Sequence, residues 1–392
     1  MAALAGPGAA SAAAPPQLSA SAAILVQPQT GDVVYARRAS APRLIASTTK
    51  MMTALLALEE RQLSYRMRVV PYRSIVGESL VGLRPGERWT TADLVRGLLL
   101  ASGGDAAQTI AVDVGGSEKR FVRLMNRRAR AAGLTGTHFG NPVGVDSPPN
   151  RSTPADLAKL ALLLRAEPFA RKVMARPSAV LRSGGRTISV TNRNTLVGAV
   201  PWVDGVKTGH TRTAGYVLVG SGTRSGVDLV SVVMGEPSEA ARNRDTVALM
   251  NWGFARYVSR TPVVAGRTVA RVPVKGRPDT AVESLRTLSV VVRRGVRLRT
   301  RLVGIPDELE GPLTAGTRVG RVEVLRGGIV VARAPVVTSA DVAAASWWSR
   351  SRSTVVPAAL LIGGGAALAG AATLALRRRV SRSARPRRTR NR

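Results

Sequence analysis

The chain has 392 residues, more than a single domain usually contains, and 45% of them are hydrophobic. We therefore expect two domains with buried cores, together with tails. No cysteine is present, which excludes disulfides, thiolate metal sites and a cysteine nucleophile. The formal net charge is +34, yet the basic residues are spread thinly and are not interleaved with aromatic residues. This pattern disfavours nucleic-acid binding and indicates an anionic envelope of lipid head groups or wall polymers as the neighbour.

The first 18 residues are uncharged and consist mainly of Ala, Gly, Pro and Ser. Small residues before Pro15-Pro16 resemble the end of a secretory signal, although a basic start and a strong apolar segment are missing. Residues 1–18 are therefore interpreted either as a signal-like segment or as a disordered leader. The strand-like runs 21–26 and 33–36, separated by a turn at residues 29–32, predict a hairpin at the start of the folded part.

The next segment, Ser47-Thr48-Thr49-Lys50, opens an apolar run over residues 51–58 that lacks Gly and Pro. This run predicts a buried helix with Ser47 in its first turn. Residues three apart share a helix face, so the Ser47 hydroxyl and the Lys50 amine can meet. A lysine can take the proton of a serine only if burial or a neighbouring cation lowers its pKa. Taken alone, the motif is more typical of an N-cap serine with an exposed lysine.

A second buried helix is predicted after Thr91, which we expect to cap the apolar residues 94–100. A turn-rich strand edge is predicted before it, at residues 80–87. The helix is broken at Ser102-Gly103-Gly104 before another helix begins, and we expect Ser102 to be exposed on this tight loop. Taken alone, the segment is more typical of a plain Gly-rich turn.

The following part alternates helices with strands. Thr153 before Pro154 predicts the start of a helix. Strand-like segments follow at residues 187–191, 203–211, 216–220 and 227–234, and a last helix is predicted over 239–254. Helices placed between an N-terminal hairpin and C-terminal hairpins predict an α+β domain with an antiparallel sheet, which we assign to residues 19–258.

The last third of the chain has a different pattern. Short strands and turns at residues 261–340 predict a small all-β domain without a cluster of catalytic groups. Residues 355–376 are uncharged and mostly apolar, which predicts a transmembrane helix, although a buried helix or a linker is the alternative. Nine arginines lie in residues 377–392, so the positive-inside tendency predicts a cytoplasmic tail and an extracytoplasmic location for both domains.

Three motifs stand in chain order: Ser47-Thr48-Thr49-Lys50, Ser102-Gly103-Gly104 and Lys207-Thr208-Gly209. Serine enzymes that react with penicillin carry S-x-x-K, S-x-N and K-T-G in this order. With Phe139-x-Asn141-Pro142-x-Gly144 between the motifs, the chain resembles the D-alanyl-D-alanine carboxypeptidases, the low-molecular-mass penicillin-binding proteins of peptidase family S11. The resemblance covers residues 19–258 closely, and it covers the β-rich segment and the anchor more loosely.

The resemblance implies a penicillin-binding, β-lactamase-like serine transpeptidase fold. It also implies a cell-membrane protein, held on the outer face by a C-terminal helix, that removes the terminal D-alanine from peptidoglycan stem peptides ending in D-Ala-D-Ala. β-Lactam antibiotics mimic this end of the peptide, so they are expected to acylate Ser47 and to inhibit. We expect no metal, no cofactor and no nucleic acid.

Ser47 is the expected nucleophile, and Lys50, as a free amine, is the expected base. The family resemblance implies that Ser102 relays a proton towards the leaving amine. Lys207 is expected to lower the pKa of Lys50 as a second cation and to bind the substrate carboxylate together with Thr208.

Three further groups complete the predicted site. Gly209 is expected to leave room for the substrate backbone. The backbone N–H groups of Ser47 and His210 are expected to form the oxyanion hole. Arg242 resembles the family's additional carboxylate-facing arginine, with Arg244 as a rival two residues away.

One residue departs from the family pattern, because Gly104 stands where the family usually has Asn. The missing amide would have oriented Lys50 and the substrate. A catalytically weakened protein that binds wall peptide or penicillin, a D,D-endopeptidase and a class A β-lactamase are therefore the alternatives. The β-lactamase would need a glutamate for deacylation, and residues 141–156 offer only Asp146 and Asp156.

Overall fold

A five-stranded antiparallel sheet forms the centre of the computed structural model, which describes residues 14–183 and 185–344. The strand order is β2-β1-β11-β10-β9, so the first hairpin pairs with a strand from far along the chain. Ile24 of β1, for example, lies opposite Val232 of β11. The strands are β1 (Ala22–Gln27), β2 (Asp32–Arg37), β9 (Val203–Thr211), β10 (Gly215–Arg224) and β11 (Val227–Glu236).

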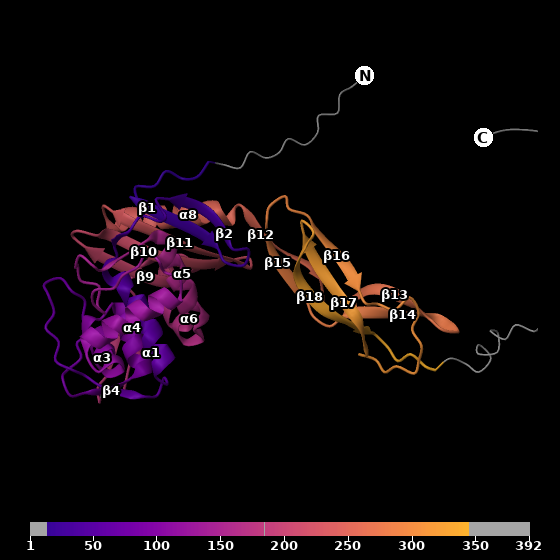
Figure 1. The fold of residues 1–392 in the computed structure, drawn as a ribbon, viewed down its shortest axis with the longest axis horizontal. Helices are drawn as coiled ribbons and strands as arrows, with labels where there is room; N and C mark the ends of the chain where they lie inside the picture. Colours follow the sequence, from indigo (N-terminus) through magenta and orange to yellow (C-terminus); the bar gives the residue numbers. More distant parts are fainter. Residues whose placement is uncertain (1–13, 184, 345–392) are drawn as a thin grey trace, which may run out of the picture. The chain divides into compact units, whose positions relative to one another are not determined.

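Both faces of this sheet are covered, because successive side chains of a strand point to opposite faces. Ile24 packs in the larger hydrophobic cluster with α5, whereas its neighbour Leu25 packs in a second cluster with α8. In Figure 1, α8 (Glu239–Phe254) lies on one face of the sheet, and α5 (Pro154–Ala166) and α6 (Pro168–Met174) lie on the other. This explains why the strands are continuous apolar runs rather than alternating ones.

A helical subdomain follows the first hairpin. The short 3₁₀ helix η1 (Ala46–Thr49) leads into α1 (Lys50–Glu60), and α2 (Thr91–Arg96) continues into a π-helix, η2 (Gly97–Ala101). Two more helices, α3 (Gly104–Gly115) and α4 (Glu118–Ala131), pack beside α1 in the larger cluster. The remaining short elements are β3 (Arg43–Leu44), β4 (Arg66–Arg68), β5 (Arg88–Thr90), β6 (Arg151–Ser152), β7 (Ser178–Leu181), β8 (Ile188–Thr191) and α7 (Leu196–Ala199).

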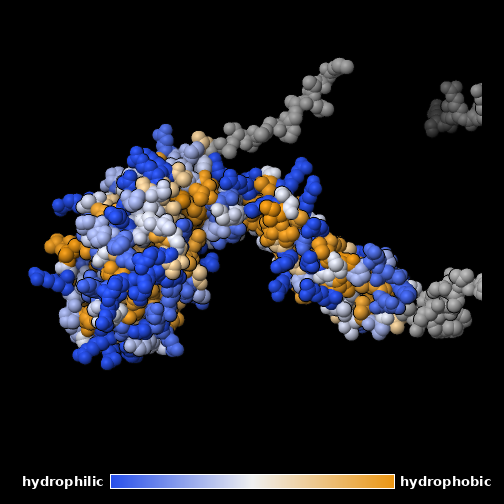
Figure 2. All heavy atoms as spheres, in the orientation of Figure 1, coloured by the Kyte–Doolittle hydropathy of each residue, from blue (hydrophilic) through white to orange (hydrophobic). Residues whose placement is uncertain are grey.

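The elements between α8 and residue 344 are all strands, and a third hydrophobic cluster lies among them. Five of them form one sheet, in the order β13-β14-β18-β17-β16, and β12 pairs with β15. Figure 2 shows hydrophilic residues over most of the visible face of the described residues. The strands are β12 (Tyr257–Val263), β13 (Thr268–Val274), β14 (Arg277–Ser284), β15 (Leu288–Arg293), β16 (Leu298–Val303), β17 (Arg318–Arg326) and β18 (Ile329–Thr338).

Several sequence-based expectations need correction. The cap of α2 is Thr90, whose side chain accepts a hydrogen bond from Asp93 N, and Thr91 is the first helical residue. No strand forms over residues 80–87, because Asp105 binds the backbone N–H groups there. The folded part begins before residue 19, since Leu18 is buried in the cluster beneath α8.

Other predictions concern residues that the structure does not describe. Residues 1–13, most of the predicted leader, lie outside the described residues, and so do the predicted transmembrane segment 355–376 and the basic tail 377–392. Among residues 14–183 and 185–344, no helix combines the length and the apolar character that crossing a bilayer requires.

Candidate active site

The predicted nucleophile and base are in contact. Lys50 Nζ lies 3.1 Å from Ser47 Oγ. Ser47 sits in η1 rather than in the first turn of the α-helix, and Lys50 opens α1. Ala46, just before the serine, has a φ of +46°, a left-handed conformation that costs free energy in a residue other than glycine. The strained turn leaves Ser47 partly exposed while Lys50 is only 1% exposed.

The loop that carries the Phe-x-Asn-Pro-x-Gly motif holds Lys50 from its other side. The Lys50 ammonium donates to the Val143 backbone oxygen, and Asn141 Oδ1 shapes this loop by accepting from Gly144 N at 2.6 Å. Gly144 has a φ of +88°, and a Cβ there would lie 2.1 Å from the Ala46 oxygen. The motif therefore needs its glycine for close packing against the turn that presents Ser47.

Burial lowers the pKa of Lys50 from 10.5 to about 8. The nearby carboxylates of Glu78 and Asp105 oppose this shift, because they favour the charged amine. Charge repulsion from Lys50 acts instead on Lys207, whose pKa burial and this repulsion together hold well below 10.5. The sequence-based expectation named Lys207 as the cause of the lowered pKa of Lys50. The leading cause is instead the burial of Lys50.

The lowered pKa predicts how acylation depends on pH. Only the free amine of Lys50 can accept the Ser47 proton, and its fraction rises about tenfold per pH unit below the pKa. We expect the second-order rate constant for acylation by a penicillin to rise between pH 6 and 8 and to level off above a midpoint of about 8. Stopped-flow measurement with a fluorescent penicillin tests this, and a rate independent of pH over this interval would contradict it.

A second serine–lysine contact lies beside the first. Lys207 Nζ donates to Ser102 Oγ at 3.0 Å and to the Thr208 backbone oxygen at 2.9 Å. Ser102 ends η2 with a φ of +64°, and it is 5% exposed rather than exposed as predicted. Lys207 lies on β9, the edge strand of the central sheet, as predicted, and is also 1% exposed.

β9 passes close to the nucleophile. A Cβ at Gly209 would lie 3.2 Å from Ser47 N and 3.0 Å from the Ile45 oxygen. The glycine therefore lets β9 pass close to the turn that carries Ser47, and its expected role of leaving room for the substrate backbone stays a prediction. The next residue, His210, stacks its ring on Tyr216 with 3.9 Å between the ring centroids. Its side chain thus has a structural contact, and its backbone belongs to the strand beside Ser47.

Of the two candidate arginines, Arg242 lies towards the site. Its positive charge lowers the pKa of Lys207, as does that of Arg193, which sequence analysis missed. Arg242 is 3% exposed and donates to Glu239 at 2.8 Å. Arg244 instead pairs with Asp245 and leaves 65% of its side chain exposed. Arg193 and Arg242 thus lie near Lys207, and an anionic group bound there would be stabilised by their charges.

The carboxylates considered for a β-lactamase have other partners. Asp146 accepts from Thr211 Oγ1 at 2.9 Å, and Asp156 accepts from Gly136 N at 2.8 Å and from Thr137 Oγ1 at 2.9 Å. Neither carboxylate forms a hydrogen bond or an ion pair with Ser47 or Lys50 within the described residues. The carboxylates that act on Lys50 are Glu78 and Asp105, which sequence analysis did not assign to the site.

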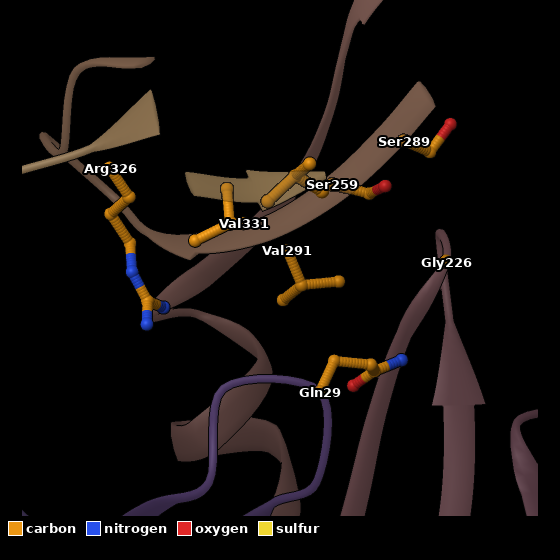
Figure 3. A pocket seen from close by; sticks show the side chains of 8 residues that line it. Gln29, Gly226, Ser259, Ser289, Val291, Arg326 and Val331 are labelled. Carbon is orange, nitrogen blue, oxygen red and sulfur yellow. The ribbon is translucent and has the colours of Figure 1, made fainter. Parts of the chain in front are cut away.

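A pocket elsewhere in the described residues has no part in this arrangement. Figure 3 shows its lining, which includes Gln29, Ser259 and Arg326. None of the predicted catalytic or binding residues lines it.

Two serine–lysine contacts beside the edge strand of an antiparallel sheet define a serine acyl-transfer enzyme with the penicillin-binding, DD-peptidase fold. Residues 9–238 match the family model of the D-alanyl-D-alanine carboxypeptidases, Peptidase_S11. The chain belongs to this family.

Relatives with the same description and fold support this assignment. D-alanyl-D-alanine carboxypeptidase DacA of Escherichia coli is 30% identical over 349 residues, covering 83% of this chain and 84% of the relative. Penicillin-binding protein 5 of Haemophilus influenzae is 29% identical with a TM-score of 0.62, and the match covers 84% of this chain and 99% of that one. The Streptomyces K15 DD-transpeptidase is 31% identical with a TM-score of 0.59, and the match covers 62% of this chain and 100% of that one.

Proposed function

We propose that the protein removes the terminal D-alanine of peptidoglycan stem peptides through an acyl-enzyme on Ser47. The observation that supports this most strongly is the 3.1 Å contact between Ser47 Oγ and the buried Lys50 amine. The Ser47 oxygen attacks the carbonyl carbon of the penultimate D-alanine, and its proton passes to Lys50. The backbone N–H groups of Ser47 and His210 stabilise the negative charge on the carbonyl oxygen, by on the order of 3 kcal/mol for each donor.

The second pair serves the leaving group. Ser102, held by the Lys207 amine at 3.0 Å, relays the proton that Lys50 has taken to the amine of the departing D-alanine as the C–N bond breaks. Water then attacks the ester carbon and gives its proton to the freed Lys50 amine, which returns a proton to Ser47 Oγ as the ester bond breaks. Lys207, Thr208 and Arg242 bind the terminal carboxylate of the peptide, with Arg193 adding positive charge. β-Lactams follow the same first step and stay on Ser47.

Replacing Arg242 by Ala is expected to raise KM for a D-Ala-D-Ala peptide by about tenfold, because a desolvated charge-assisted contact contributes roughly 1.5–3 kcal/mol. The matched control is Arg244→Ala, since Arg244 is mostly exposed and pairs with Asp245. Steady-state release of D-alanine distinguishes the two variants. Equal KM values for both would remove Arg242 from the carboxylate site.

We also propose how the rest of the chain serves this activity. The strands after α8 form a small β domain of their own at residues 261–340, residues 355–376 cross the cytoplasmic membrane, and the catalytic domain faces outward after export. The motivation is the length of the uncharged segment and the arginine-rich tail that follows it. Fractionation of cells that produce the whole chain or a chain ending at residue 344 tests the anchor: only the whole chain should sediment with membranes.

The proposed activity is tested by two assays on the wild type and on Ser47→Ala. A fluorescent penicillin should label only the wild type, and only the wild type should release D-alanine from a diacyl peptide ending in D-Ala-D-Ala. Labelling without release would favour a degenerate receptor, and rapid loss of the label would favour a β-lactamase. Adding a crosslinked dimer or an amine acceptor distinguishes an endopeptidase or a transpeptidase from the carboxypeptidase.

A further inference from the structure

The space beside Gly104, where the family's asparagine side chain would begin, is filled. A Cβ built at Gly104 would lie 2.1 Å from Glu78 Oε1 and 3.0 Å from Tyr72 Cε1. Carbon and oxygen atoms cannot approach this closely without bonding, so any side chain at position 104 would have to displace Glu78. The carboxylate therefore stands in the place that the missing side chain leaves free.

Glu78 is held there by the segment that contains it. Gly104 N donates to the Ser79 backbone oxygen at 2.8 Å. Asp105 accepts from Val81 N at 2.9 Å and from Gly82 N at 2.7 Å. Ser79, Val81 and Gly82 are thus fixed against the turn that carries Ser102, and they hold the backbone next to Glu78 beside Gly104.

The neighbouring glycine fits the same explanation. A Cβ at Gly103 would lie 2.4 Å from Val81 Cγ2 and 3.2 Å from Val81 N. Both glycines of the Ser102-Gly103-Gly104 motif are therefore needed for the segment to close on the turn, which a plain Gly-rich turn does not explain.

The carboxylate is oriented by one tyrosine and acts on the catalytic base. The Tyr72 hydroxyl donates to both oxygens of Glu78, at 2.6 and 2.7 Å. Burial and this contact raise the pKa of Tyr72, so its hydroxyl keeps the proton that it donates. The negative charge of Glu78 also favours the protonated form of Lys50 and so raises its pKa.

We propose that Glu78, oriented by Tyr72, is a positioning residue that acts on Lys50 in place of the side chain absent from position 104. This inference rests on the proposed acylation of Ser47. A carboxylate accepts hydrogen bonds but donates none, whereas an asparagine does both. The site thus has a carboxylate beside the turn that carries Ser102, and it lacks the amide donor that asparagine would offer to the substrate.

Exchange of the two side chains tests the proposal. The measured quantity is the second-order rate constant for acylation by a fluorescent penicillin, with the whole chain. At about pH 9, where Lys50 is mostly a free amine in every variant, Glu78→Ala is expected to lower it about tenfold or more, because a base displaced by a fraction of an ångström loses alignment with its proton. Gly104→Asn is also expected to lower it, because the new side chain collides with Glu78. The double variant should return to within about threefold of the wild type, since the emptied space admits the amide, so the two effects are strongly non-additive.

Two controls separate positioning from general damage. Val76→Ala changes a fully exposed side chain of the same segment and should acylate as the wild type does. Glu78→Gln keeps the shape of the side chain but removes its charge, so the pH midpoint of acylation should move to lower pH. The charges of Asp105 and Lys207, which also lie near Lys50, remain in this variant. Tyr72→Phe should lower the rate and leave the negative charge in place.

The outcomes are distinct. If Glu78→Ala acylates like Val76→Ala, or if the double variant shows the product of the two single losses, the inference is overturned while the proposed function stands. If Glu78→Ala does not fold, Glu78→Gln still decides, because an unchanged pH midpoint in that variant contradicts an action on Lys50. A wild type that takes up no penicillin would instead reject the proposed function.

Discussion

Replacement of Lys50 by methionine is expected to lower the rate constant for acylation about a thousandfold, the range found when a general base is lost. Lys50 is 1% exposed, and its amine lies 3.1 Å from Ser47 Oγ, within reach of the proton that must move. Methionine has a similar length and no charge, so it should fill the same space without disturbing the turn. The loss would then be chemical and not structural.

Stability measurements separate these two causes. Burial of a charged amine costs free energy, and an apolar replacement of similar volume commonly keeps or raises stability. We expect Lys50→Met to melt at or above the temperature of the wild type at pH 7 while acylation is nearly abolished. Wild-type acylation by a folded Lys50→Met protein would show that some other group takes the Ser47 proton.

Removal of the Asp105 carboxylate is expected to have the largest effect on stability. Asp105 is 5% exposed and accepts hydrogen bonds from four backbone N–H groups, those of Val81, Gly82, Leu83 and Ala106. Truncation to alanine leaves two buried donors, Val81 N and Ala106 N, without this partner. We expect Asp105→Ala to lower the free energy of unfolding by about 3 kcal/mol. It should also slow acylation, because the segment that holds Glu78 comes loose.

Denaturation in urea measures the free energy of unfolding of Asp105→Ala, and penicillin labelling measures its rate of acylation. The matched control is Asp113→Ala at the other end of the same helix, α3, where the carboxylate pairs with Arg61 near the surface. A surface ion pair contributes roughly 0–1 kcal/mol, so this control should be nearly neutral. Equal losses in the two variants would contradict the role given to Asp105.

The parts of the site that local spacing determines could be predicted from the sequence. Ser47 and Lys50 are three residues apart at a helix start, so their contact follows from helical geometry. Thr153 caps α5 as expected, with its side chain accepting from Asp156 N. The bounds of α8 were also predicted correctly, because the segment lies between a strand and a new β pattern.

The parts that depend on distant segments could not be predicted. The Lys50 amine meets the Val143 oxygen only because a loop about ninety residues further along is folded by Asn141. Glu78 belongs to no recognisable motif. The sequence feature related to it is the pair Gly103-Gly104, whose need for glycine becomes clear only when the packing of residues 78–81 against this pair is known.

The cause of the lowered pKa of Lys50 shows the same limit. A second cation could be placed in the site from the Lys207 motif, and the structure does bring the two amines close enough to repel each other. Burial, however, has the larger effect on Lys50, and two carboxylates act against it. The burial of one side chain depends on every element packed around it. The spacing of residues within one motif therefore cannot predict how strongly Lys50 is buried.

Peptide mapping of the protein after reaction with penicillin tests the central claim most directly. After proteolysis, mass spectrometry should find the penicilloyl adduct on the peptide that contains Ser47, and Ser47→Ala should carry none. An adduct on Ser102, or a wild-type protein without any adduct at saturating penicillin, would contradict the assignment of Ser47 as the nucleophile.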